Sequence, residues 1–398
     1  MHSYLTAHIA GTGGVIKESP EDFIVSEIPA YEACGTGEHL YLTIEKRGIT
    51  TLEAIRRIAG RLKLSERDVG YAGMKDAVGV TRQTISLQGT RPEAVLALQL
   101  DGITIVSATR HTNKLKPGHL KGNRFQITIR GVASSAAVSA AAIVEVLLHR
   151  GVPNFFGYQR YGAQGNSHLI GAAMLHRDWQ RAVDCLIGQP DAVRDVEWRS
   201  AISAYQQGDL TEALRRMPRH CRTEREIMQR LASRPGMWEK AFSVVHPRLK
   251  KLYLSAFQSY LFDKVVEGRL AAIDRVMAGD LAWKHMNGAC FLVDDLEAEE
   301  PRAACFEISA SGPIFGSRMK QSAGAVLLLE QRILEDEGLS PDDFDLGSGL
   351  RMEGERRPLR VPLENAACRA EADALILEFS LPRGSYATSV VREITKNF

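Results

Sequence analysis

The fold and chemistry of this chain depend on a glycine-rich stretch that reads Gly70-Tyr71-Ala72-Gly73-Met74-Lys75-Asp76 and continues, two residues later, as Gly79-Val80-Thr81-Arg82-Gln83. Glycine reaches backbone conformations closed to other residues and lets a ligand approach the main chain, so Gly70, Gly73 and Gly79 predict a loop. A carboxylate in such a loop can act as a nucleophile, and Lys75 would favour the ionised form of Asp76. Asp and Gly are also ordinary turn residues, so this pattern alone leaves a structural turn open.

Segments of alternating apolar and polar residues lie on both sides of this loop. Such alternation predicts half-buried strands. A helix is expected between the second and third strands, because Thr50 and Glu53 form a capping-box signature that apolar residues at helical spacing follow. The three predicted strands cover residues 23–28, 40–44 and 82–87.

The clearest alternation covers residues 123–130. There Phe125, Ile127 and Ile129 fall on one face of the predicted strand, and Asn123 begins the strand on the same face. An amide beside an aromatic ring could read the edge of a nucleobase, or it could cap the end of the strand.

Size and composition indicate an ordinary globular protein. The chain has 398 residues, of which 44% are hydrophobic and 25% are charged, so two to three domains are expected. No apolar run approaches the ~20 residues of a membrane span, and the first residues do not resemble a signal peptide, which predicts a cytoplasmic protein without membrane contact. The six cysteines lack a C-x-x-C pair, so neither a zinc site nor a disulfide framework is indicated.

The net charge of +2 neither requires nor excludes a nucleic-acid partner, because clustering on one face matters more. Residues 110–124 hold several basic side chains, Lys114 and Lys121 among them, and no acidic one, which would suit phosphates. Residues 215–230 are rich in arginine, but acidic residues are interleaved, so a solvated helix face explains them equally well.

The second half of the chain is expected to be largely helical before it returns to a strand. Residues 153–162 combine aromatics, glycines and Arg160 in a loop that could stack unpaired bases or plug a domain junction. The other expected elements are a helix over 134–149, a helix through 252–265, a loop over 308–316, an exposed acidic connector over 335–345, a strand over 374–379 and a helix from about 385.

Several blocks together resemble the TruD family of tRNA pseudouridine synthases, in one order over nearly the whole chain. The most specific block is the one around Asp76, at residues 70–83. The other blocks are residues 17–27, Asn113-Lys114-Leu115-Lys116-Pro117-Gly118 with Gly122-Asn123-Arg124-Phe125, residues 154–162, 255–262, 311–316, 356–360 and 381–388.

The resemblance implies roles for particular residues. It makes Asp76 the nucleophilic aspartate, and it places four residues around the target uridine, although relatives can carry phenylalanine at the last of these positions. The implied uridine pocket consists of Phe23, Asn123, Phe125 and Tyr386. Candidate RNA-binding residues are Lys17, Lys75, Lys114, Lys121 and Arg160.

The resemblance also implies the fold. It is of the α/β (α+β) class, with a pseudouridine synthase catalytic core built on a mixed, mainly antiparallel sheet. A helix-rich TRUD domain interrupts this core. The expected boundaries are 1–154 and 361–398 for the catalytic domain and 155–360 for the insertion.

The implied activity is the isomerisation of uridine to pseudouridine in tRNA, at position 13, by a monomer that needs no metal, other cofactor or protein partner. The alternative is a non-catalytic RNA-binding or RNA-chaperone protein on the same scaffold. Asp76 favours the enzyme, because a carboxylate near a phosphate chain would repel it. A hydrolase using Asp76 would normally need a metal cluster or a partner base, and no such motif is evident.

Overall fold

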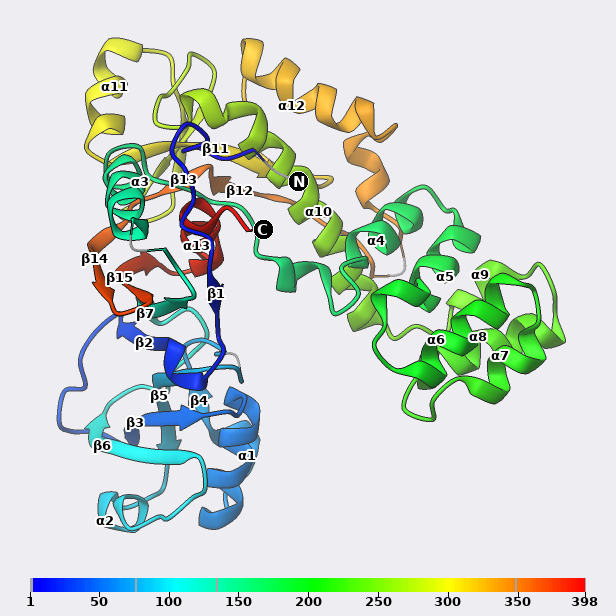
Figure 1. The fold of residues 1–398 in the computed structure, drawn as a ribbon, viewed down its shortest axis with the longest axis horizontal. Coiled ribbons are helices and arrows are strands. Elements are labelled where there is room, and N and C mark those ends of the chain that lie inside the picture. Colours follow the sequence, from blue (N-terminus) through cyan, green and yellow to red (C-terminus); the bar gives the residue numbers. More distant parts are fainter. Residues whose placement is uncertain (1–2, 76, 134, 348, 398) are drawn as a thin grey trace. The chain divides into compact units, whose positions relative to one another are not determined.

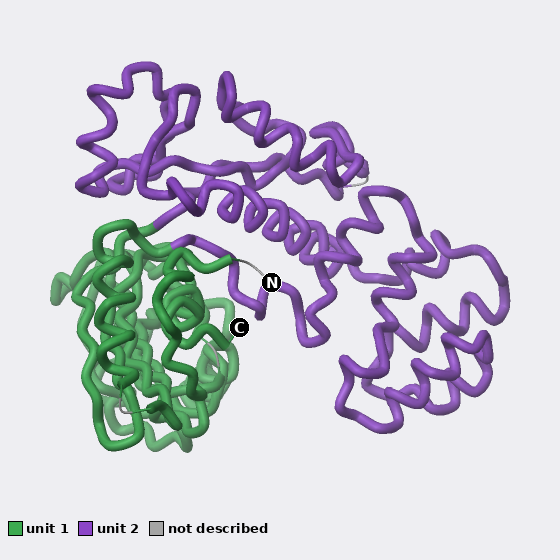
Figure 2. The backbone as a smooth tube through the Cα atoms, turned by 45° about the horizontal axis from the view of Figure 1, so that its top comes forward, with its two compact units in different colours: residues 1–152, 361–398 green, residues 153–360 purple. Residues whose placement is uncertain are grey.

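The computed structural model describes residues 3–75, 77–133, 135–347 and 349–397. The chain divides into two compact units, the first made of residues 1–152 and 361–398 and the second of residues 153–360 (Figure 2). Asp76 lies outside the described residues. Among the described residues, no helix combines the length and the apolar character needed to cross a membrane.

The first unit is built on a large sheet with the strand order β14-β15-β7-β2-β5-β3-β6, to which β1 adds beside β7 and β4 beside β5 (Figure 1). The strands are β1 (Val15–Ile16), β2 (Phe23–Pro29), β3 (His39–Arg47), β4 (Gly70–Tyr71), β5 (Val80–Gln88), β6 (Ile103–His111), β7 (Leu120–Arg130), β14 (Glu364–Glu371) and β15 (Ala374–Pro382). The helices are η1 (Pro20–Asp22), α1 (Thr51–Leu62), η2 (Glu66–Asp68), α2 (Pro92–Leu96), α3 (Ala136–Arg150) and α13 (Ala387–Thr395).

The sheet is mixed and mainly antiparallel, as predicted. Strands β2 and β5 run parallel, whereas β2 with β7, β7 with β15, and β3 with β5 and β6 run antiparallel. The predicted strands over 23–28, 40–44, 82–87, 123–130 and 374–379 are confirmed as parts of β2, β3, β5, β7 and β15.

Helix α1 covers one face of β3 and β5 (Figure 1). Its Thr50 cap accepts a hydrogen bond from the backbone N–H of Glu53 (3.1 Å), as the capping signature predicted. Ile55 and Ile58 of the helix pack against Leu42 and other apolar side chains of the sheet. This layer fixes the strands that flank the glycine-rich stretch.

The second unit combines helices with a smaller sheet of order β10-β9-β11-β12. Its helices are η3 (Tyr158–Tyr161), α4 (Ser167–Leu175), α5 (Trp179–Ile187), η4 (Pro190–Ala192), α6 (Val196–Gln206), α7 (Leu210–Arg216), α8 (Arg222–Ser233), α9 (Trp238–Phe242), α10 (Pro247–Arg269), η5 (Leu270–Ala272), α11 (Leu296–Ala304), α12 (Gly324–Asp336) and η6 (Pro341–Phe344). Its sheet strands are β9 (Leu281–Lys284), β10 (Cys290–Leu292), β11 (Ile308–Ile314) and β12 (Glu355–Pro358), and β8 (Val152–Pro153) pairs with β13 (Arg360–Val361) where the chain passes between the units.

The prediction of a loop over 308–316 is wrong. Residues 308–314 form β11, whose side chains are all buried between β9 and β12. A Cβ on Gly312 would lie 2.8 Å from Leu359 Cδ2, so the glycine there serves close packing rather than a turn. A strand buried on both faces loses the alternation by which strands are recognised.

The predicted acidic connector over 335–345 is wrong in part. Glu335 and Asp336 end helix α12, and residues 341–344 form the short helix η6. Phe344 is fully buried and anchors this segment. Acidic residues dominate the composition of the segment, but Leu339 and Phe344 are buried and hold it against the rest of the protein.

Candidate functional site

One face of the central strands gathers side chains that are far apart in the sequence. Val25 of β2 pairs with Phe125 of β7 on one side and with Thr81 of β5 on the other. Thr81 in turn pairs with Lys46 of β3. Since paired residues point to the same face of a sheet, Phe125, Thr81 and Lys46 lie in one row across it.

A more polar row follows two residues further along the strands. Asn123 of β7 pairs with Glu27 of β2 and with Leu381 of β15. Gln83 follows Thr81 by two residues, so its buried side chain points to the same face. The predicted pocket residues Asn123 and Phe125 therefore lie beside buried polar groups of three other strands.

The aromatic part of this face is a line of three rings. The ring of Phe125 stacks on Phe379 of β15, with centroids 5.3 Å apart, and lies 6.3 Å from Phe23. The ammonium of Lys17 lies 4.2 Å from the centroid of Phe23, which is a cation–π distance. The structure thus brings together three predicted site residues, Phe23, Phe125 and Lys17.

Four side-chain oxygens of the first unit are buried without a hydrogen-bond partner among the described residues. They are Asn123 Oδ1, Thr81 Oγ1, Ser385 Oγ and Thr388 Oγ1. Buried polar atoms are normally paired, so unpaired ones mark strain, a functional role or a place that a ligand fills. Asn123 and Thr81 lie on the strand face of Phe125, which favours a ligand there with both an apolar ring and polar edges.

The loop before Asp76 is tied to the sheet and to α1. The backbone N–H of Lys75 donates to Thr51 Oγ1 (2.8 Å), and this hydroxyl donates to Gln83 Oε1 (2.8 Å). Gln83 Nε2 donates in turn to the carbonyl of Gly73 (3.3 Å). One side chain of β5 thus holds both the loop and the first turn of α1.

The buried Lys46 ammonium also holds this loop. It donates to the carbonyl of Ile49 (2.7 Å) and, with a longer bond, to that of Lys75 (3.4 Å). A charged group inside a protein needs such partners, because its desolvation is costly. Lys46 therefore contributes a positive charge directly beside the residue that precedes Asp76 in the sequence.

Glu27 and Lys75 form a buried ion pair. Lys75 Nζ lies 3.3 Å from Glu27 Oε2, and their side chains are only 7% and 2% exposed. Glu27 Oε1 accepts the backbone N–H of Thr84 (3.2 Å). Burial raises the pKa of the Glu27 carboxyl, and the charge of Lys75 acts against that rise. Because the Lys75 ammonium is buried and paired, little of its surface remains for an RNA phosphate.

Two glycines of the stretch are required by close approach. Gly79 has a φ of 137°, and a Cβ there would collide with the carbonyl oxygen of Phe23. A Cβ on Gly70 would collide with the carbonyl oxygen of Leu115. Gly70 and Tyr71 form the short strand β4, so the predicted loop begins after Tyr71.

Tyr386 is half-buried and directly precedes helix α13. The turn before it is joined to the start of β7, because the backbone N–H of Arg383 donates to the carbonyl of Lys121 (2.9 Å) and its guanidinium to that of Gly118 (2.6 Å). Asn123 follows Lys121 by two residues, so this turn meets the end of β7 that carries Asn123.

The other predicted RNA-binding residues have different surroundings. Lys121 is exposed, whereas the Lys114 ammonium donates to the carbonyl of Arg67 (2.8 Å). Arg160 belongs to the second unit, where its guanidinium donates to Ser259 Oγ (2.8 Å) and to Ser255. These contacts leave Lys121 the most accessible of the three.

The aromatic block over 153–162 is embedded in the second unit. Tyr161 donates to Asp263 Oδ2 (2.6 Å), and the backbone N–H of Phe156 donates to Asp263 Oδ1 (2.9 Å). Phe155 is buried, whereas Tyr158 is exposed. Most of the block's aromatic side chains therefore have a structural role, and Tyr158 is the one that presents its ring to solvent.

Sequence reasoning missed the polar residues of this face. Lys46 continues the face of Leu42 and Ile44 in β3, Gln83 continues the face of Ile85 in β5, and Glu27 continues the face of Val25 in β2. A charged or amide residue in register with an apolar face was the available signal. A polar group at such a position is buried, so it either has a hydrogen-bond or ion-pair partner or takes part in function.

The comparisons with known proteins agree over the full chain. A model of the family "tRNA pseudouridine synthase D (TruD)" matches residues 1–394. Proteins called tRNA pseudouridine synthase D from Geotalea daltonii and Geobacter metallireducens are 62% and 64% identical to the chain, over 100% and 99% of it and 100% and 97% of their own lengths. A crystal structure of a TruD protein from Methanosarcina mazei superposes with a TM-score of 0.86 at 26% identity, over 100% of this chain and 96% of that one.

These matches define the class of protein first: it is an enzyme, an isomerase of the tRNA pseudouridine synthase class. Within that class the chain belongs to the TruD family. The resemblance found in the sequence is thereby confirmed, and the enzyme is favoured over the non-catalytic RNA-binding alternative.

Proposed function

We propose that this enzyme converts uridine to pseudouridine at position 13 of tRNA, with Asp76 as its essential catalytic carboxylate and no cofactor. The observation that carries the proposal is the unpaired Asn123 Oδ1 beside the Phe23–Phe125 pair, on the face next to the loop that leads to Asp76. A detached uracil offers an aromatic plane and a polar edge, which match these two features.

The reaction is an exchange of bonds without net oxidation or hydrolysis. The bond between ribose C1′ and N1 of uracil breaks, the base turns, a bond forms between C5 and C1′, and the proton of C5 is lost while N1 gains one. A carboxylate can add to the sugar or the ring, or accept a proton, and then leave. Such chemistry needs no metal, nicotinamide or ATP.

The proposed pocket residues would bind the uracil ring rather than take part in the breaking and forming of bonds. Extruding the uridine from its stack costs a few kcal/mol, and stacking on Phe125 recovers ~1 to 3 kcal/mol. Asn123 would bind the uracil edge, and Phe23 and Tyr386 would exclude water while the base turns. Lys17 and Lys121 would contact phosphates, and the second unit, with Arg160, would hold another part of the folded tRNA. We also propose a monomer that acts in the cytoplasm.

The substitution Asp76→Asn tests the role of Asp76. We expect it to abolish tritium release from tRNA labelled at uridine C5, while tRNA binding is retained. Asp68→Asn, in an exposed position near the same loop, should leave tritium release unchanged. Turnover by Asp76→Asn at the wild-type rate would refute the assignment. Pseudouridine mapping on a tRNA with cytidine in place of uridine 13 tests the position separately, since the product should then be absent.

A further inference from the structure

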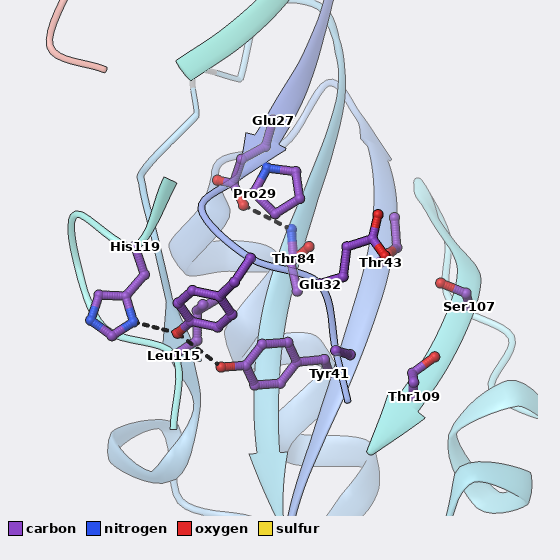
Figure 3. Close-up of a pocket in the computed structure, with 12 residues that line it drawn as sticks. Glu27, Pro29, Glu32, Tyr41, Thr43, Thr84, Ser107, Thr109, Leu115 and His119 are labelled. Atoms are coloured by element: carbon purple, nitrogen blue, oxygen red, sulfur yellow. Dashed lines mark hydrogen bonds between the residues drawn. The ribbon is translucent and has the colours of Figure 1, made fainter. Parts of the chain in front are cut away.

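A second site lies on the other face of the main sheet. A pocket of about 300 Å³ opens between strands β3, β5 and β6 and the segment 29–33, which passes over them (Figure 3). Its floor includes Thr43, which points away from the face of Leu42 and Ile44 because neighbouring residues of a strand alternate. Thr84 and Ser107, which pair with Thr43, share this orientation, so the floor of the pocket lies on the face opposite that of Thr81 and Gln83. Glu27, which accepts the backbone N–H of Thr84, lines the pocket as well and also belongs to the row of Asn123 on the Phe125 face. The lining of the pocket consists of Glu27, Pro29, Tyr31, Glu32, Ala33, Tyr41, Thr43, Thr84, Ser107, Thr109, Leu115 and His119.

The floor of the pocket is a row of hydroxyl groups. Thr43 of β3 pairs with Thr84 of β5 and with Ser107 of β6, so three hydroxyls from three strands lie side by side. The register between β3 and β6 shifts directly after this row. Bulges of this kind often re-aim side chains next to binding sites. These hydroxyls can donate and accept hydrogen bonds along one edge of a flat ligand.

The wall of the pocket is an aromatic group held in place by hydrogen bonds. Tyr31 Oη lies 2.6 Å from His119 Nδ1 and 3.4 Å from Tyr41 Oη (Figure 3). The Tyr31 ring also stacks on His111, with centroids 5.2 Å apart and planes 21° from parallel. Although Tyr31 is 38% exposed, these contacts fix it in advance, which lowers the entropy lost when a ligand binds.

The charged side chains that line the pocket indicate which kind of ligand it can bind. The lining in this described part of the chain carries two carboxylates, Glu27 and Glu32, and neither lysine nor arginine. Glu27 is paired with Lys75, whereas Glu32 is exposed and its carboxylate lies toward Thr43 (Figure 3). A phosphate would be repelled here, and a neutral ligand with N–H donors would be attracted.

Positive charge lies just outside the lining. Lys114 and Lys116 flank Leu115, which lines the pocket, and the Lys116 side chain is exposed. A nucleotide has this same division, with an anionic phosphate on the outside and an uncharged base that can enter an aromatic pocket.

We propose that this pocket binds a second unpaired nucleobase of the RNA substrate, one that carries an amino group. The base would lie against Tyr31 and Tyr41 and donate its amino hydrogens to Glu32 and the hydroxyl row. Guanine, which presents two adjacent N–H donors to a carboxylate, suits the site best; uracil would turn carbonyl oxygens toward Glu32. The inference rests on the proposed function for the identity of the ligand as RNA.

Nucleoside binding tests the pocket without requiring turnover. We expect guanosine, adenosine and cytidine to bind the wild-type chain, and Ser107→Phe to weaken this binding about tenfold by filling the floor. Ser107 is exposed, so the larger ring should be accommodated without unfolding, which circular dichroism would verify. Thr104→Phe, at an exposed position of the same strand outside the lining, is the control and should bind as the wild type does.

The Glu32→Gln substitution tests the selection of the base. It should reduce the preference for guanosine over inosine, which lacks the amino group, about tenfold. With tRNA, Ser107→Phe should raise KM about tenfold, and Thr104→Phe should not. Unchanged guanosine binding in Ser107→Phe would overturn the pocket, and weakened guanosine binding with unchanged KM would overturn its use by RNA. If no RNA is isomerised at all, the proposed function fails while the nucleoside test of the pocket still stands.

Discussion

Asn123 is a residue whose importance for activity should exceed its importance for stability. Its Oδ1 is buried and lacks a hydrogen-bond partner among the described residues, so the folded protein gains little from this oxygen. A ligand that supplies a donor would gain the full hydrogen bond. The same argument applies to Thr81 Oγ1 in the next row.

We therefore expect Asn123→Ala to lower kcat/KM for tRNA about ten- to hundredfold, the equivalent of 1 to 3 kcal/mol, and to change the free energy of unfolding by less than about 1 kcal/mol. Steady-state tritium release and urea unfolding would measure the two quantities. Gln126→Ala, on the opposite face of β7, is the matched control and should affect neither strongly. A large loss of stability in Asn123→Ala would show that the amide is structural.

His285 gives the second unit a residue with a defined pH response. Its Nε2 lies 2.9 Å from Ser309 Oγ, and burial, with a smaller contribution from the charge of Arg360, lowers its pKa from 6.5 to about 4. As pH falls below 6.5, the unfolded chain binds a proton that the folded chain refuses until about pH 4. The stability that neutral His285 provides is thus complete above pH 6.5 and is lost as pH falls toward 4.

The expected loss is about 3 kcal/mol, since one pKa unit corresponds to about 1.4 kcal/mol. Other groups titrate over the same range, so the test is the difference in unfolding free energy between the wild type and His285→Gln, measured by urea titration from pH 7.5 to 4. As pH falls, the free energy of unfolding of His285→Gln should rise relative to that of the wild type. A difference that stays constant with pH would contradict the lowered pKa.

At the level of elements, the glycine-rich stretch packs against strand β2 and thereby positions Phe23. Gly79 leads into β5 with a φ of 137°, and the carbonyl oxygen of Phe23 leaves no space for a Cβ. The position of Phe23 against Phe125 therefore depends on a glycine in a neighbouring element. Backbone strain and crowding both oppose any other residue at this position.

We expect Gly79→Ala to destabilise the chain by about 1 to 3 kcal/mol and to lower kcat/KM as well, because β2 and Phe23 must shift. Thermal unfolding and tritium release would test both parts. Gly89 also has a positive φ, 71°, but open space around it, so Gly89→Ala measures the backbone strain without the crowding. Equal effects of the two substitutions would mean that contact with Phe23 has no particular role.

Most elements that sequence could predict have one face toward the core and one toward solvent; β15 is an exception, because its apolar run over 374–377 was recognised although the strand is buried on both faces. Alternation identified β2, β3, β5 and β7, and the Thr50 cap identified α1. It could not identify β11, which is buried on both faces. Within α1, Leu52 is the first of the apolar residues at helical spacing, which predicts that it faces the core, but it is 54% exposed. Its neighbour Thr51 is buried instead and donates a hydrogen bond to Gln83.

The candidate site was predictable only in part for the same reason. Phe125 and Asn123 stood out because they share one strand face, and family resemblance supplied Phe23 and Tyr386. The places of Lys46 and Glu27 in the site follow from the pairing of neighbouring strands. This pairing depends on contacts between distant parts of the sequence, which local pattern does not reveal. The pocket at Tyr31 depends on a segment that folds over three strands, and local pattern carries no signal for that.

At the scale of the whole molecule, the second unit is an insertion into the first. The expected boundary was 154/155, and the structure divides the chain at 152/153 and at 360/361. Strands β8 and β13, which contain these divisions, pair with each other, so the two ends of the first unit lie within the spacing of neighbouring strands. A short linker can therefore join residue 152 to residue 361.

We expect the first unit closed by a Gly-Ser linker to unfold cooperatively, because its sheet and its α1 core lie entirely within it. It should bind full-length tRNA at least about tenfold more weakly than the intact chain, and its affinity should fall less steeply with salt, because the phosphate contacts that we propose for the second unit would be gone. A short stem-loop that contains only the target uridine should bind both proteins equally. Equal affinity of both proteins for full-length tRNA would show that the second unit contributes no contacts to RNA.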